Sequence, residues 1–196
     1  MPIRAVCVFC GSQPGARPSY LRAARDLGAQ LARRGWTAVY GGGHVGMMGA
    51  LADSTLAAGG KVIGVIPEHL MRSEVAHQGL SELLVVDSMH TRKRLMAGRS
   101  DAFVVLPGGY GTLEEMFEMV TWRQLALHAK PVGLLDVDGY FGHLLAFLRH
   151  AADEAFVRPQ HRGLLRVEAS VEPLLDRLAR EAAAAPDAGA WQLERS

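Results

Sequence analysis

The sequence lacks long hydrophobic runs, paired histidines and clustered cysteines. No segment approaches the roughly 18 uninterrupted apolar residues of a membrane helix, and the short apolar run in MPIRAVCVFCGS reaches glycine at once. We therefore expect a cytoplasmic protein that does not enter a membrane. The eight histidines include no H-x-x-x-H pair, so the sequence gives no support for a metal site and we expect none.

Cysteine is scarce, and its spacing argues against redox chemistry. The two cysteines, Cys7 and Cys10, form a C-x-x-C arrangement within a run that alternates like a strand. Side chains three residues apart in a strand point to opposite faces of the sheet. We interpret both as structural and expect no disulfide between them.

Neither sign of charge is in excess. The chain has 21 basic and 20 acidic side chains, a formal net charge of +1. It therefore offers no general field for nucleic acid or an anionic membrane, and we expect neither as a partner. Any anion must be bound locally. With 196 residues, of which 49% are hydrophobic and 21% charged, the chain has the composition of one folded soluble domain.

Apolar β-rich runs alternate with amphipathic helical stretches along the chain. The order begins AVCVFC, YLRAARDLGAQLARRG, TAVYGGG, GMMGALADSTLAAGG, KVIGVIP and resumes with LLVVDS, RKRLMAGRS, DAFVVLPGG, a helix from Thr112, PVGLLDV and YFGHLLAFLRHAADEAF. This pattern predicts a single α/β domain over residues 1–181, with a parallel sheet covered by helices on both faces. The Ala/Pro/Gly-rich residues 182–196 are expected to be a disordered tail.

Three glycine-rich loops follow predicted strands, where open α/β sheets bind ligands. They are CGSQPG, GGGHVGMMG and LPGGYGT. Such a loop before a helix can seat a phosphate, although glycine can equally serve only to turn the chain. GGGHVG also fits G-x-G-x-x-G, with Glu68 at the end of the next strand, but this match alone is a weak signal.

The loop at residues 107–112 has two interpretations. Thr112 could bind a phosphate oxygen with its hydroxyl. Alternatively, Thr112 could be the N-cap of a capping box in which Glu115 reaches back to the cap amide. The residues alone favour capping.

The helix that follows has an unusual second face. A helical projection places Leu113, Met116, Phe117 and Val120 on the core side, and Glu115, Glu118, Met119 and Trp122 on the other. Apolar residues on that second face suggest that substrate or another subunit covers it, so we expect a dimer. Candidate cations at the same sheet edge are Arg92, Lys93 and Arg94, and Glu74 follows the third strand at that edge.

These motifs resemble one known family. MHTRKRLM, followed by SDAFVVLPGGYGTLEEMFEMVTWRQL, is similar to the signature of the Lonely Guy family of cytokinin riboside 5'-monophosphate phosphoribohydrolases, whose motif is PGGxGTxxE. The resemblance continues through FCGS, VYGGGHVGMMG, VIGVIP and KPVGLLDVDGY, and covers roughly residues 5–160.

The resemblance implies a Rossmann-like fold, a homodimer, no cofactor, and hydrolysis of N6-substituted adenosine 5'-monophosphates to free base and ribose 5-phosphate. It implies that Arg92 and Glu115 are catalytic. The expected substrate-binding residues are Glu74, Lys93, Gly109, Tyr110, Gly111, Thr112, Leu113, Glu114 and Thr121, together with Ser12, Gly42, Gly43 and Met89.

Two other functions remain open from the sequence. A pyridoxal-phosphate decarboxylase needs a Schiff-base lysine, and of Lys61, Lys93 and Lys130 only Lys93 lies at the ligand edge. A noncatalytic nucleotide carrier could use the same fold, since fold does not determine function. The residues do not distinguish AMP from an N6-prenylated substrate.

Overall fold

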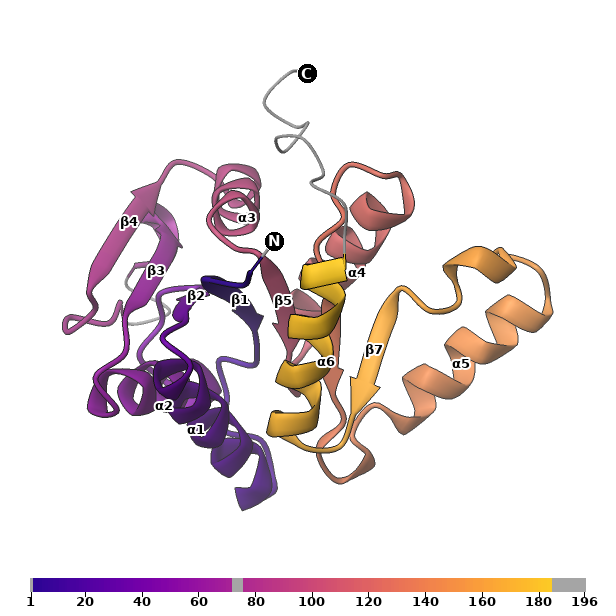
Figure 1. Ribbon diagram of the computed structural model, residues 1–196. Coiled ribbons are helices and arrows are strands. Elements are labelled where there is room, and N and C mark those ends of the chain that lie inside the picture. Colours follow the sequence, from indigo (N-terminus) through magenta and orange to yellow (C-terminus); the bar gives the residue numbers. More distant parts are fainter. Residues whose placement is uncertain (1, 72–75, 185–196) are drawn as a thin grey trace.

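The computed structural model describes residues 2–71 and 76–184 (Figure 1). Residues 182–184, which we assigned to the tail, belong to a helix, and the rest of that segment lies outside the described residues. No helix in the described part of the chain is both long enough and apolar enough to cross a membrane.

Seven parallel strands form one sheet in the described residues. They are β1 (Ala5–Phe9), β2 (Thr37–Tyr40), β3 (Val62–Pro67), β4 (Glu82–Val86), β5 (Ala102–Val105), β6 (Val132–Leu135) and β7 (Leu165–Glu168). Their order is β4-β3-β2-β1-β5-β6-β7. Their apolar composition fits this arrangement, because parallel strands are covered on both faces. The predicted parallel α/β sheet is confirmed.

Helices cover the two faces of the sheet (Figure 1). One face packs against α1 (Pro18–Arg33), α2 (Gly46–Ala57) and α6 (Val171–Ala184). The other packs against α3 (Met89–Gly98), α4 (Tyr110–Gln124) and α5 (Gly142–Asp153). Short 3-10 helices occur at η1 (Glu68–Leu70), η2 (Val137–Gly139) and η3 (Pro159–His161). Each face of the sheet thus has its own apolar cluster.

Local sequence explains how α1 forms and packs. Pro18 is its first residue, where a missing amide hydrogen costs no helical bond. Tyr20, Ala24, Leu27 and Leu31 recur at helical spacing and are buried against the sheet. The helix stops before Gly35, which has a φ of 69°.

The two cysteines confirm the alternation predicted for the first strand. Cys7 belongs to the apolar cluster on the α3/α4 side, whereas Cys10 belongs to the cluster on the α1/α2 side. Both thiols are buried and neither is in a disulfide.

The core face of α4 differs from our prediction. Met119 is completely buried in the cluster, whereas Phe117, assigned to the core, is 36% exposed. Met116 is buried as expected, and Trp122 is half-buried against the same cluster. Met119 and Trp122 therefore pack within one chain, which removes the observation on which we had based a dimer.

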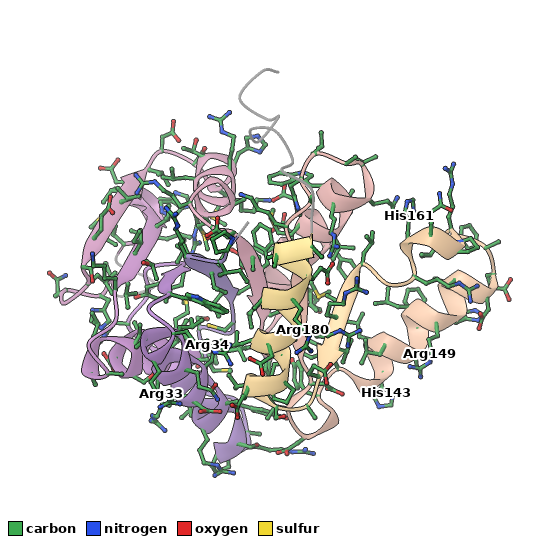
Figure 2. The ribbon with its side chains drawn as sticks, viewed as in Figure 1. Arg33, Arg34, His143, Arg149, His161 and Arg180 are labelled. Carbon is green, nitrogen blue, oxygen red and sulfur yellow. The ribbon has the colours of Figure 1, made fainter. Side chains whose placement is uncertain are left out.

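Basic side chains are spread over the surface and several of them join elements. Figure 2 shows Arg33 and Arg34 at the end of α1, Arg180 on α6 and Arg149 on α5. Arg34 donates to Asp176 of α6 at 2.7 Å. Glu181 of α6 pairs with Arg166 of β7 at 2.6 Å and also with Arg123 of α4. This last network ties the end of α4 to the edge of the sheet.

Replacing Glu181 with glutamine should lower the free energy of unfolding by about 1–3 kcal/mol at neutral pH. Burial opposes ionisation of Glu181, but hydrogen bonds from Arg166 and Arg123 outweigh it and lower the pKa of this carboxyl. The stabilisation is therefore complete above the ordinary glutamate pKa and is lost as the pH falls through the lowered value. Urea denaturation at pH 7 and at steps below pH 4.5 measures this, with the exposed Glu172→Gln as control. An unchanged difference at all pH values would contradict it.

Candidate active site

The glycine loops meet where the strand order reverses. The chain builds outward from β1 through β2, β3 and β4, and then returns to place β5 on the other side of β1. The carboxyl ends of β1 and β5 flank this switch point, where open α/β sheets bind ligands. Gly11 donates its N–H to the carbonyl of Pro107 at 3.0 Å, which joins the first and third loops. Tyr140 donates to the carbonyl of Gly108 at 2.7 Å.

The start of α4 is open towards this point. Gly109 is the N-cap, and no side chain caps the helix. The first helical hydrogen bond runs from the N–H of Leu113 to the carbonyl of Gly109, at 3.1 Å. The N–H groups of the preceding turn consequently have no acceptor within the helix. This helix start has the donors and the dipole direction that favour an anion.

The capping-box interpretation of this loop is wrong. Thr112 is the third helical residue rather than the N-cap, and it is buried. Its hydroxyl oxygen lies against Gly108, where an added Cβ would overlap it and would also come 2.8 Å from the N of Gly11. Glycine at residue 108 therefore allows the first loop, the third loop and Thr112 to approach closely.

Arg92 places a buried positive charge beside the second glycine loop, defined here as residues 41–43. Its side chain comes from α3, and the residue is only 4% exposed. Nη2 donates to the carbonyl of Gly41 at 2.9 Å, and Nη1 lies 3.6 Å from the sulfur of Met89. A Cβ on Gly41 would overlap the guanidinium. This contact orients the cation, because a buried guanidinium needs acceptors for its N–H groups.

Glu115, in the second turn of α4, is half-buried. Burial raises the pKa of the Cys7 thiol, and the negative charge of Glu115 raises it further, while Lys130 and Arg92 act in the opposite direction. Burial and then Glu115 also raise the pKa of Cys10. The pKa of Cys7 thus responds to both residues expected to be catalytic, Glu115 raising it and Arg92 lowering it.

Lys93 is held by two carboxylates on α4. It pairs with Glu114, and with Glu118 at 3.1 Å. Burial lowers the pKa of this lysine, but the two glutamates outweigh burial and the pKa is raised. A Schiff base requires a neutral amine, so the one lysine at the ligand edge is unsuited to that chemistry. The role of Glu118 as a partner of Lys93 had no signal in the sequence beyond its position on the helix.

The remaining predicted residues lie in different surroundings. Gly42 and Gly43 are buried in the second glycine loop, and Ser12 is exposed beside Gly46 at the start of α2. Thr121 is exposed two turns along α4 from Thr112. The other members of the α4 set, Tyr110, Gly111, Leu113 and Glu114, occupy its first two turns. Glu74 lies outside the described residues, and Glu68 is exposed on η1.

His44, Asp53 and His77 form a cluster that the sequence did not reveal. Their potential ligand atoms lie within 4.8 Å of one another. Nε2 of His77 lies 2.9 Å from Asp53, and its Nδ1 accepts the N–H of Gly79 at 2.9 Å. An N–H can only donate, so Nδ1 has the lone pair and Nε2 carries the proton. His77 therefore has no lone pair on the atom that faces the cluster, and the geometry favours a His–Asp pair over a metal site.

The fold and the site together define a Rossmann-like α/β protein with an open helix start, a buried arginine and a carboxylate at its topological switch point. A family model described as "Possible lysine decarboxylase" matches residues 48–178. The chain belongs to this family, which is the Lonely Guy family indicated by the sequence motifs.

Curated relatives of this chain carry one name. The rice protein "Probable cytokinin riboside 5'-monophosphate phosphoribohydrolase LOGL9" is 56% identical over 161 residues, which are 82% of this chain and 71% of the relative. Cytokinin riboside 5'-monophosphate phosphoribohydrolase LOG5 of Arabidopsis thaliana is 46% identical over 175 residues, 89% and 77% of the two chains.

Solved structures agree in fold. The molybdenum cofactor (Moco) carrier protein from Chlamydomonas reinhardtii matches with a TM-score of 0.71 and 24% identity, over 93% of this chain and 99% of that one. At this identity the likeness shows the fold alone.

Proposed function

We propose that the protein is a cytoplasmic, cofactor-independent hydrolase that cleaves the N-glycosidic bond of N6-substituted adenosine 5'-monophosphates. The products are the free cytokinin base and ribose 5-phosphate. Relatives 46–56% identical bear the corresponding name. The observation that carries the proposal is the uncapped start of α4 with the half-buried Glu115 in its second turn, together with the buried Arg92 held at the carbonyl of Gly41.

The phosphate of the nucleotide would bind at the start of α4. The N–H groups of residues 110–112 and the hydroxyl of Thr112 supply donors there, and the open space beside Gly109 leaves room for the phosphate oxygens. Binding at the phosphate, remote from the scissile bond, positions the ribose for reaction. Lys93, held by Glu114 and Glu118, would orient these two carboxylates beside the nucleotide.

Glu115 and Arg92 would act on the two sides of the breaking bond. Cleavage passes through an oxocarbenium-like ribose, which the carboxylate of Glu115 stabilises while it orients the attacking water. Negative charge builds up on the departing purine, and the guanidinium of Arg92 balances it. The contact with Gly41 holds that guanidinium in place before substrate arrives.

A noncatalytic nucleotide carrier is the alternative from a different class. The Moco carrier protein of Chlamydomonas reinhardtii is 24% identical to this chain, which shows a shared fold and not a shared function. A half-buried carboxylate beside a bound anion opposes binding unless it has a chemical task. Glu115 therefore favours the hydrolase.

Incubating the purified protein with AMP or with isopentenyladenosine monophosphate, followed by chromatography, should detect free base. The matching nucleosides lack the phosphate and should be hydrolysed with lower kcat as well as weaker binding. Binding of nucleotide without any release of base would favour the carrier. Equal turnover of nucleotide and nucleoside would refute the phosphate site at α4.

The substitution Glu115→Gln should lower kcat by about a hundredfold or more, because an amide neither stabilises a developing positive charge nor accepts a proton from water. Glu115 is not part of an N-terminal capping box, so the melting temperature should barely change. Steady-state kinetics and thermal denaturation test both parts. Glu172→Gln, an exposed glutamate on α6 far along the chain from the site, is the control. Retention of most activity by Glu115→Gln would exclude the proposed mechanism.

We also propose that the chain forms a homodimer through the outer face of α4. Tyr110 and Phe117, seven residues apart, share this face and are 95% and 36% exposed, and Leu125 just beyond the helix is 61% exposed. An apolar stripe of this kind beside a ligand site is typical of an interface. It replaces the face of Met119 and Trp122 on which we had first based the dimer.

Phe117→Glu should convert the dimer to monomers, because it places a charge in an apolar contact. Sedimentation velocity at micromolar concentration measures the assembly. Phe147→Glu, which changes a 64% exposed phenylalanine on α5, should leave it intact. A monomeric wild-type protein, or dissociation by Phe147→Glu alone, would show that the α4 stripe is not the interface.

A further inference from the structure

Each carbonyl of the second glycine loop accepts a hydrogen bond from a different part of the chain. Gly41 accepts from Nη2 of Arg92 at 2.9 Å, and Gly43 accepts from the hydroxyl of Tyr40 at 3.0 Å. Between them, Gly42 accepts from the backbone N–H of His77 at 3.0 Å. Gly43 also forms an isolated antiparallel bridge with Ala76. The segment that carries His77 is therefore one of the supports that fix this loop.

The ring of His77 is held on three sides. It is 6% exposed, with Asp53 at Nε2 and the N–H of Gly79 at Nδ1. The ring of His44 packs edge-on against it, with centroids 4.5 Å apart and an interplanar angle of 82°. A ring with both nitrogens hydrogen-bonded and a second ring packed against it is held in one orientation, and the backbone N–H of the same residue donates to Gly42.

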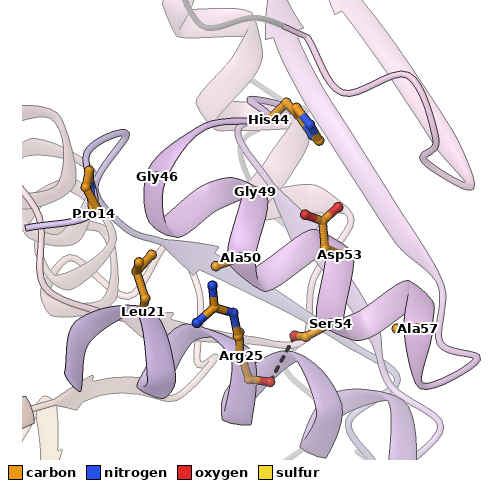
Figure 3. A pocket seen from close by; sticks show the side chains of 10 residues that line it. All are labelled: Pro14, Leu21, Arg25, His44, Gly46, Gly49, Ala50, Asp53, Ser54 and Ala57. Atoms are coloured by element: carbon orange, nitrogen blue, oxygen red, sulfur yellow. Dashed lines mark hydrogen bonds between the residues drawn. The ribbon is translucent and has the colours of Figure 1, made fainter. Parts of the chain in front are cut away.

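Asp53 connects the ring of His77 to α2, the helix that follows the second glycine loop. It lies on α2, which starts at Gly46, and Figure 3 shows it below His44 at one end of the pocket between α1 and α2. The loop leads into α2, Asp53 of α2 contacts the ring of His77, and the backbone N–H of His77 donates back to Gly42 of the loop. Because the Asp53 side chain is 60% exposed, its removal leaves no buried cavity.

We propose that Asp53 and His77 form a latch that fixes the second glycine loop and, through the carbonyl of Gly41, the guanidinium of Arg92. The inference rests on the proposed function for its kinetic consequence. The loop has little freedom to move independently of the guanidinium, since Gly41 has no space for a Cβ beside it. His77 and Asp53 are thus positioning residues that act through Arg92, and small displacements of such a group lower the rate of the chemical step.

The test compares Asp53→Ala, Asp53→Asn and a control, Asp26→Ala, which changes a 51% exposed aspartate on α1. Asparagine keeps an oxygen that accepts the proton of Nε2, whereas alanine does not. Asp53→Ala should lower kcat for the nucleotide about tenfold or more with a nearly unchanged melting temperature. Asp53→Asn should restore most of the loss, and Asp26→Ala should match wild type.

A second measurement does not depend on catalysis. The Nε–H resonance of Arg92 in a two-dimensional NMR spectrum, assigned by its disappearance in Arg92→Lys, should shift in Asp53→Ala and return towards the wild-type position in Asp53→Asn. If the wild-type protein cleaves no nucleotide, the proposed function fails and this resonance alone decides on the latch. An Asp53→Ala protein with the wild-type Arg92 resonance would overturn the latch, and so would wild-type kcat if the enzyme is active.

Discussion

The buried contact between Arg92 and the carbonyl of Gly41 constrains the whole ligand edge of this protein. Arg92 is only 4% exposed, and a buried guanidinium needs acceptors, one of which is the backbone oxygen of Gly41 just after β2. The cation comes from α3, and its side chain reaches the loop that follows β2. Glycine at residue 41 follows from this contact. The His77 segment holds the same loop, because its backbone N–H donates to the carbonyl of Gly42.

Much of the fold could be predicted because its signals are local. Continuous apolar strands separated by helices define a parallel sheet, and the spacing of Cys7 and Cys10 predicted the opposite faces that they occupy. The buried face of α4 could not be predicted in the same way. Phe117 and Met119 are both apolar and two residues apart, so hydrophobicity gave no reason to prefer one. The N-cap was also predicted at the wrong residue. The composition favoured Thr112, but Gly109 is the N-cap and the helix begins at Tyr110.

The parallel topology predicts which edge of the sheet carries the candidate site, but not the contacts within it. Residues that follow strands must meet at one edge, and this placed the glycine loops, Arg92 and Glu115 near one another. The partners of these groups arise from packing between segments that share no pattern. Lys93 reaches Glu114 across 21 residues, and His77 reaches Asp53 across 24. Nothing in the sequence VAHQG around His77 distinguishes a buried histidine with hydrogen bonds at both ring nitrogens from a histidine on the surface.

The buried thiol of Cys7 in β1, with that of Cys10 just after the strand, can report on local opening of the protein. Burial and the carboxylate of Glu115 raise the pKa of both thiols, so little of either is present as the reactive thiolate in the folded protein. β1 lies between β2 and β5 at the centre of the sheet, and exposure of Cys7 requires that the α3/α4 cluster separate from it. Alkylation by iodoacetamide would therefore proceed only at the rate at which the central strand is uncovered.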